Sequence, residues 1–150
     1  YMDLYAENIL EHYRNPHCKA PLSYRSRDLP AGRQGGAGGE GHTYHTESNP
    51  ACGDEITVSM NIRDDHIGSI RWDGTGCAIS QAAMSMLSEA LEGKTLEEVD
   101  ALTKENILTL LGVPIGPRRL KCALLGLHAC KNALRKAQGK PGKGWAESVL

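Results

Sequence analysis

Three cysteines lie at positions where the sequence changes character, and each could supply a thiolate ligand. Cys52 comes just before a strand-like run, Cys77 follows a Gly-Thr-Gly turn, and Cys122 lies near the start of the last helical segment. Asp54 follows Cys52 across a glycine, which allows the backbone to turn tightly. Three thiolates and one carboxylate would complete a four-coordinate shell suited to Zn²⁺ or to an iron–sulfur cluster.

The surroundings of these thiols favour reactivity, although spacing alone does not establish a site. Cys77 and Cys122 lie near predicted helix N-termini, where partial positive charge favours the thiolate, and Lys121 adds a charge beside Cys122. A buried cysteine is more often simply a small apolar residue, and that interpretation fits Cys18 and Cys130. No CxxC motif is present, so spacing leaves a metal site and ordinary core packing about equally open.

Hydrophobic periodicity indicates the elements that would position these residues. Two alternating runs around Asp64-Asp65 predict a β-hairpin, and a weaker third strand precedes it. Steps of three and four predict helices before and after these strands, with a Thr95/Glu98 capping box and stops at Gly93 and Gly112. The expected strands are 43–48, 55–63 and 67–72, and the expected helices are 3–15, 77–91, 95–102, 103–111 and 118–138.

This order predicts an α+β fold, a small antiparallel sheet of two or three strands with helices packed on one face. We expect a single domain over 1–150 with a flexible tail over about 139–150. A long loop over 18–42 is glycine-rich between about 30 and 42. A surface insertion is favoured there over a phosphate-binding loop, because no Gly-Lys-Ser/Thr follows and no helix opens after the glycines.

Composition excludes several classes of protein. The chain has 150 residues and a net charge of −1, which gives no electrostatic footprint for nucleic acid. No apolar run is long enough for a bilayer crossing, and the first residues do not resemble a signal peptide. Five scattered cysteines are typical of ligands or nucleophiles in a reducing compartment. We therefore expect a cytoplasmic protein without a membrane partner.

Four sequence blocks resemble the IscU/SufU/NifU-N-terminal scaffold family of iron–sulfur cluster assembly. They are His12-Tyr13-Arg14-Asn15-Pro16 with the preceding Leu4-Tyr5, then Asn49-Pro50-Ala51-Cys52-Gly53-Asp54, then Gly76-Cys77-Ala78-Ile79-Ser80, and finally Arg119-Leu120-Lys121-Cys122-Ala123. The order and separation of these blocks are highly specific, and the resemblance covers nearly the whole chain. It implies the small α+β fold of that family.

The resemblance also implies roles for the site residues. Cys52, Asp54, Cys77 and Cys122 would hold Zn²⁺ or a transient [2Fe–2S] cluster, with Asp54 keeping the cluster labile as a hard ligand among soft ones. Cys122 would accept persulfide sulfur from a cysteine desulfurase. An iron donor and apo-protein cluster acceptors are the other partners that the resemblance implies.

Three departures from the family pattern bear on subfamily and partners. Lys121 stands where many IscU proteins have histidine, as in SufU-type members, whereas the short interval from Cys77 to Cys122 is similar to IscU. The Leu-Pro-Pro-Val-Lys stretch that dedicated chaperones recognise is absent, and Pro114-Ile115-Gly116-Pro117-Arg118 stands near its place. A dedicated chaperone partner is therefore not expected. The glycine-rich loop before Cys52 is longer than the resemblance predicts.

Three functions compete on this evidence. A non-enzymatic scaffold that builds and passes on a cluster is favoured, and a zinc-bound sulfurtransferase that relays persulfide sulfur is the alternative, supported by Lys121. A zinc hydrolase is disfavoured, because four protein ligands leave no open position and no acid–base pair lies nearby. His128 follows Cys122 by six residues, which turns it to a different helix face, so a structural or surface role is predicted.

Overall fold

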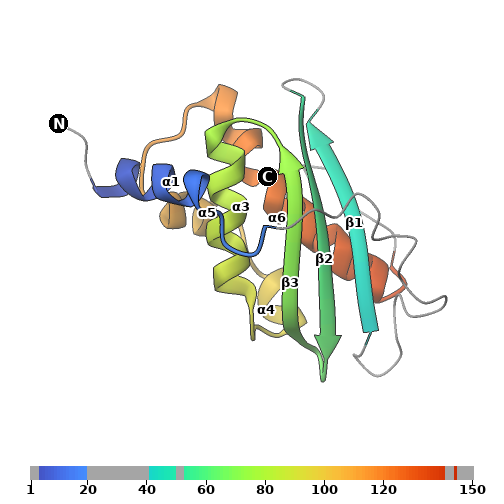
Figure 1. Ribbon diagram of the computed structural model, residues 1–150. Coiled ribbons are helices and arrows are strands. Elements are labelled where there is room, and N and C mark those ends of the chain that lie inside the picture. Colours follow the sequence, from blue (N-terminus) through green and yellow to red (C-terminus); the bar gives the residue numbers. More distant parts are fainter. Residues whose placement is uncertain (1–3, 20–40, 50–52, 141–143, 145–150) are drawn as a thin grey trace.

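A three-stranded antiparallel sheet forms one layer of the molecule (Figure 1). The computed structural model describes residues 4–19, 41–49, 53–140 and 144. The strands are β1 (Gly41–Asn49), β2 (Asp54–Arg63) and β3 (His66–Thr75), in the order β1-β2-β3. The predicted hairpin and the weaker third strand are both confirmed, and with them the α+β fold class.

The helices pack against this sheet and against one another. They are α1 (Leu4–Arg14), α3 (Ala78–Leu91), α4 (Leu96–Asp100), α5 (Lys104–Leu111) and α6 (Pro117–Ala137). The long helix α6 lies against β1 and β2, while α3 lies beside β3 and against α6 (Figure 1). None of the described helices is both long and apolar enough for a bilayer crossing.

The sequence signals for helix boundaries operate as expected. The Thr95 hydroxyl accepts from the Glu98 backbone N–H while the Glu98 carboxylate accepts from the Thr95 N–H, which completes the predicted capping box. Gly112 ends α5 in the left-handed conformation, with φ 71°. Pro117 begins α6, where its missing N–H costs no hydrogen bond.

The core lies between one face of the sheet and the helices α3 and α6. Along β2 the buried side chains alternate as predicted: Ile56, Val58, Met60 and Ile62. Each fully buried side chain of this size contributes about 1.5–3 kcal/mol through burial. This packed layer fixes where the ends of β2 and β3 lie relative to α3 and α6.

The alternation predicted for the strand 67–72 would place Ile67 on the opposite face of the sheet from Ile70 and Trp72. This prediction is wrong, because all three side chains are buried. The pairing shifts between Asn61 and Ile62, where Asn61 pairs with Ser69 and Ile62 with Ile67. This β-bulge leaves Gly68 unpaired and turns Ile67 back towards the core.

Two strand boundaries also differ from the predicted ones by more than one residue. β3 continues to Thr75 rather than ending at Trp72, and β1 begins at Gly41, inside the segment predicted to be loop. His42 is held in β1 because it pairs with Asn61 and its Nε2 lies 2.7 Å from the Ser59 hydroxyl. Most of the glycine-rich loop (30–42) and most of the tail (139–150) lie outside the described residues, so their predicted character and the single-domain boundary remain predictions.

Candidate metal centre

Asp54 and Cys77 meet at one end of the sheet because β2 begins where β3 ends. Glu55 pairs with Thr75, so the chain leaving β3 passes next to Asp54. Asp54 is only 2% exposed, and its Oδ1 accepts a hydrogen bond from the Cys77 backbone N–H at 3.2 Å. Its Oδ2 lies 3.7 Å from Cys77 Sγ. The carboxylate thus fixes the backbone of Cys77 and faces its thiol.

Gly76 makes this approach possible. Its φ is +152°, and a Cβ built there would lie 2.6 Å from Asp54 Oδ1 and 2.7 Å from the Ser80 hydroxyl oxygen. Any other residue would therefore combine a strained backbone with a steric clash. The Ser80 hydroxyl donates to the Cys77 carbonyl at 3.0 Å, which holds the turn from the other side. Sequence reasoning did not give Ser80 or Gly76 a role, although both lie in the block around Cys77.

Cys122 reaches the same place from α6. Its side chain is 4% exposed, and the ligand atoms of Asp54, Cys77 and Cys122 all lie within 4.8 Å of one another. A tetrahedral Zn²⁺ with bonds of about 2.3 Å to sulfur and 2.1 Å to oxygen holds those atoms about 3.6 Å apart. The 3.7 Å between Cys77 Sγ and Asp54 Oδ2 is close to that spacing. Two thiols and a carboxylate therefore fit a borderline or thiophilic metal.

The two thiols differ in their helix environments. Cys77 is the N-cap of α3, where the helix dipole favours a thiolate. Cys122 is the sixth residue of α6, because that helix begins at Pro117. The dipole acts mainly within the first turn, so the prediction that it activates Cys122 is not supported by the helix boundary. Lys121 is exposed on the neighbouring face of the helix.

The remaining cysteines fall into three different positions. Cys52, the fourth predicted ligand, lies outside the described residues. Cys130 is fully buried in the core as predicted, and burial raises the pKa of its thiol to about 12. Cys18 is partly buried and packs against the core, in keeping with its predicted apolar role, and it also lies beside His17 and Glu92. Nothing in the local sequence could show how close it lies to Glu92.

His128 lies away from Asp54 and Cys77, in contact with β1. It is 2% exposed, and its Nε2 lies 3.5 Å from Glu47 Oε1. Burial lowers the pKa of His128, although the neighbouring Glu47 opposes that shift. Glu47 Oε2 also accepts from Asn132 and lies 2.8 Å from His45 Nε2. The residue belongs to a polar network between β1 and α6, in keeping with its predicted structural role.

Comparison with known proteins places this geometry in a family. The family model for the NifU-like N terminal domain matches residues 4–143. The chain is 28% identical to a zinc-dependent sulfurtransferase SufU of Bacillus subtilis, over 91% of this chain and 92% of that protein. It is 32% identical to iron-sulfur cluster assembly protein 2 of Arabidopsis thaliana, over 93% of this chain and 77% of that protein.

A solved structure shares the fold. It is described as a putative iron-sulfur cluster assembly scaffold protein for the SUF system, from Fervidobacterium islandicum. It is 25% identical and superimposes with a TM-score of 0.61, covering 85% of this chain and 94% of that one. The resemblance drawn from the four sequence blocks is thereby confirmed.

Proposed function

The chain belongs to the family of NifU-like N-terminal domains, and from that premise we propose that it is a scaffold for iron–sulfur cluster assembly. It accepts sulfur and iron, assembles a transient [2Fe–2S] cluster and transfers it to apo-proteins. The observation that carries this proposal is the convergence of Asp54, Cys77 and Cys122, whose ligand atoms lie within 4.8 Å of one another. These residues come from three separate elements, so only the folded chain brings them together.

Cys52 completes the proposed ligand set. It is two residues from Asp54, and Gly53 between them has φ +77°, a conformation that turns the chain sharply. Three thiolates suit iron or zinc, whereas the Asp54 carboxylate is a harder ligand that exchanges more readily. A cluster held in this way is cargo rather than a permanent cofactor, which suits transfer to another protein.

Cys122 is the proposed acceptor of sulfur. Its thiolate attacks the outer sulfur of a desulfurase persulfide, the S–S bond breaks, and the desulfurase cysteine leaves as a thiolate, so no external oxidant is needed. Because Cys122 is 4% exposed, it has to move outward first. The connection between Leu111 and Pro117 contains two glycines and a proline and has no helix or strand, which suits such a movement.

Zinc-bound sulfur transfer is the second candidate. Lys121 before Cys122 and the similarity to a zinc-dependent sulfurtransferase favour it. In this case Zn²⁺ would occupy the same ligands, and Cys122 would relay sulfur without cluster assembly. Both candidates need a cysteine desulfurase, and cluster assembly also needs an iron donor and apo-protein acceptors. A cytoplasmic location goes with both, since thiolate ligands need a reducing compartment.

Persulfide mapping tests the sulfur-accepting step. The protein is incubated with a cysteine desulfurase and cysteine, and mass spectrometry then locates the extra sulfur. We expect it mainly on Cys122, and we expect Cys122→Ser to lose it. Cys130→Ser is the matched control, since Cys130 lies two turns further along the same helix and is fully buried. Persulfide chiefly on Cys130 or Cys18, with Cys122→Ser fully competent, would contradict the assignment.

A further inference from the structure

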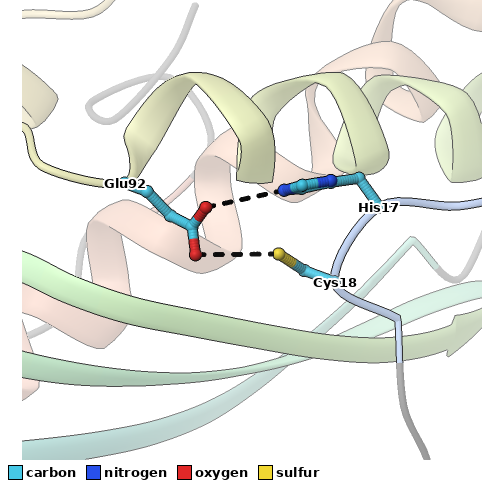
Figure 2. A group of neighbouring side chains, drawn as sticks. All are labelled: His17, Cys18 and Glu92. Atoms are coloured by element: carbon cyan, nitrogen blue, oxygen red, sulfur yellow. Dashed lines mark hydrogen bonds and ion pairs between the residues drawn. The ribbon is translucent and has the colours of Figure 1, made fainter.

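We propose that His17, Cys18 and Glu92 form a second metal site, for a borderline divalent cation such as Zn²⁺. Figure 2 shows the three side chains converging, with His17 and Cys18 from the segment after α1 and Glu92 from the end of α3. Their ligand atoms all lie within 4.8 Å of one another. An imidazole, a thiol and a carboxylate are the three ligand types that Zn²⁺ takes in proteins.

The separations fit a shared ion better than direct contacts. His17 Nε2 lies 3.5 Å from Glu92 Oε1, and Cys18 Sγ lies 3.9 Å from Glu92 Oε2 (Figure 2). The first distance is longer than the usual 2.7–3.2 Å of an N–H···O hydrogen bond. A tetrahedral Zn²⁺ sets nitrogen and oxygen ligands about 3.4 Å apart, and sulfur and oxygen ligands about 3.6 Å apart. Small adjustments of the side chains would therefore let all three groups bind one ion, which leaves a fourth position for water.

The His17 side chain gives an independent argument for a cation at this site. Its Nε2 is buried and makes no hydrogen bond within the described part of the chain. Such a nitrogen normally has a partner, because leaving a buried polar atom unsatisfied costs about 1–3 kcal/mol. The lone pair of a neutral imidazole at this atom is a metal ligand. A cation between Nε2 and the Glu92 carboxylate would satisfy both groups.

The backbone of His17 and Cys18 is held rigidly, as a metal site requires. The His17 N–H donates to the Ser85 hydroxyl at 2.7 Å, and its carbonyl accepts from Trp72 Nε1 at 2.7 Å and from the Ser88 hydroxyl at 3.1 Å. The Cys18 carbonyl accepts from the Trp72 N–H at 3.1 Å, on the outer edge of β3. These bonds anchor the segment to both β3 and α3.

Two further observations show that the arrangement is imposed by the fold. Cys18 has φ +63°, which is unfavourable for a residue with a side chain and costs about 1–3 kcal/mol. Beside Glu92, the Gly93 N–H donates to the Ile67 carbonyl at 2.8 Å, so this segment is also fixed to the edge of β3. Both ligand-bearing segments thus meet along one strand edge, which presents the three side chains to one another.

A role for Cys18 as a nucleophile fits less well. Burial and the neighbouring Glu92 carboxylate both raise the pKa of its thiol, while Ser88 and Arg71 oppose that shift. A free Cys18 is therefore mostly protonated and a poor nucleophile. A dication that binds both the Cys18 thiolate and the Glu92 carboxylate offsets the repulsion between their two negative charges.

The second site is separate from the first. Cys77 caps the N-terminus of α3 and Glu92 caps its C-terminus, with 14 helical residues between them. At 1.5 Å per residue the two groups lie about 21 Å apart. One metal ion cannot serve both, so the chain would bind two.

Metal titration of the full-length chain tests this inference. Cys77→Ser and Cys122→Ser together remove two ligands of the first site, and the metal-free double variant is titrated with Co²⁺. We expect one equivalent to bind with the near-ultraviolet absorption of a thiolate–cobalt bond. Adding Cys18→Ser should abolish that absorption. Its persistence after that substitution, or its absence from the double variant, would overturn the proposal.

A second test uses two conservative variants that should not disturb folding. Glu92→Gln keeps the size of the side chain but removes its charge, and we expect Co²⁺ affinity to fall by at least about tenfold. Glu89→Gln is the matched control, since Glu89 is an exposed glutamate one turn earlier on α3. Equal affinity for the two variants would contradict the site. Cys18→Ser alone should leave cluster assembly intact, so failure of this inference is distinguishable from failure of the proposed function.

Discussion

Asp54 has two tasks at once, because one oxygen fixes the Cys77 backbone and the other faces the Cys77 thiol. The sequence predicted the three residues that the structure brings together, since four specific blocks mark them. Their distances could not be predicted, because the ligand atoms come from elements far apart in the chain. The proximity of Cys18 to Glu92 could not be predicted for the same reason, because the two residues are 74 positions apart in sequence.

Asp54→Ala tests the carboxylate as the exchangeable ligand. We expect the cluster to persist longer on the variant and to transfer more slowly, because the ligand that opens most easily is lost. The substitution also leaves the partly buried Cys77 N–H without its acceptor, so stability should fall by about 1 kcal/mol. The measurement is the transfer half-time to an apo-ferredoxin. Asp100→Ala, at the exposed end of α4, is the control and should transfer the cluster at the wild-type rate. Equal or faster transfer by Asp54→Ala would refute this role.

Gly76→Ala tests the turn that seats Cys77 against Asp54. The new Cβ would lie 2.6 Å from Asp54 Oδ1, and the backbone there has φ +152°. We expect metal binding to be lost and the free energy of unfolding to fall by about 1–3 kcal/mol. Gly116→Ala is the control, since its Cβ would meet nothing within 4 Å. Wild-type metal content and stability in Gly76→Ala would show that the close approach is not needed.

At the level of elements, most boundaries could be predicted because their signals are local. The capping box at Thr95 and the glycine after Leu111 act within a few residues, and both appear as expected. The β-bulge at Gly68 could not be predicted from alternation, since it depends on how β3 pairs with β2. The start of α6, by contrast, was predicted to within one residue, and both the predicted and the observed start leave Cys122 in the second turn.

Gly126→Ala tests how α6 presents Cys122 to α3. A Cβ at Gly126 would lie 2.7 Å from Met84 Sδ and 3.3 Å from Met84 Cβ, so the Met84 side chain would have to move and the two helices would have to shift slightly apart. Overpacking of this kind costs about 1–3 kcal/mol, partly offset by the better helix propensity of alanine. Cys122 lies one turn before Gly126, so metal affinity measured by chelator competition should fall.

Met84→Ala should compensate for Gly126→Ala. It removes the side chain that the new methyl group meets, so the double variant should regain metal affinity relative to Gly126→Ala alone. Unchanged affinity in Gly126→Ala, or no recovery in the double variant, would show that this helix contact does not position Cys122.

At the scale of the whole molecule, the partly buried His42 and the buried His128 make stability depend on pH. Burial lowers the pKa of His42 and of His128 below the ordinary 6.5. Below that value the unfolded chain binds protons that the folded chain does not, so stability is lost as pH falls. Glu47 adds to the loss at lower pH: burial acts to raise its pKa, but hydrogen bonds from His45 and Asn132 lower it below 4.5.

His128→Gln should flatten the upper part of this dependence. The measurement is the free energy of unfolding of the metal-free protein in urea, between about pH 7 and pH 5. The wild type should lose stability over this range, and the variant should lose less, with His42 accounting for the remainder. An identical slope in the two proteins would show that His128 does not contribute.

Anaerobic reconstitution with ferrous iron, cysteine, a cysteine desulfurase and an electron donor, which reduces the persulfide sulfur to sulfide, tests the central claim most directly. We predict the visible absorption of a [2Fe–2S] cluster, its transfer to an apo-ferredoxin, and its loss in Cys77→Ser and Cys122→Ser but not in Cys130→Ser. Bound zinc and persulfide on Cys122, with no cluster absorption under the same conditions, would contradict the scaffold and identify the chain as a sulfur relay.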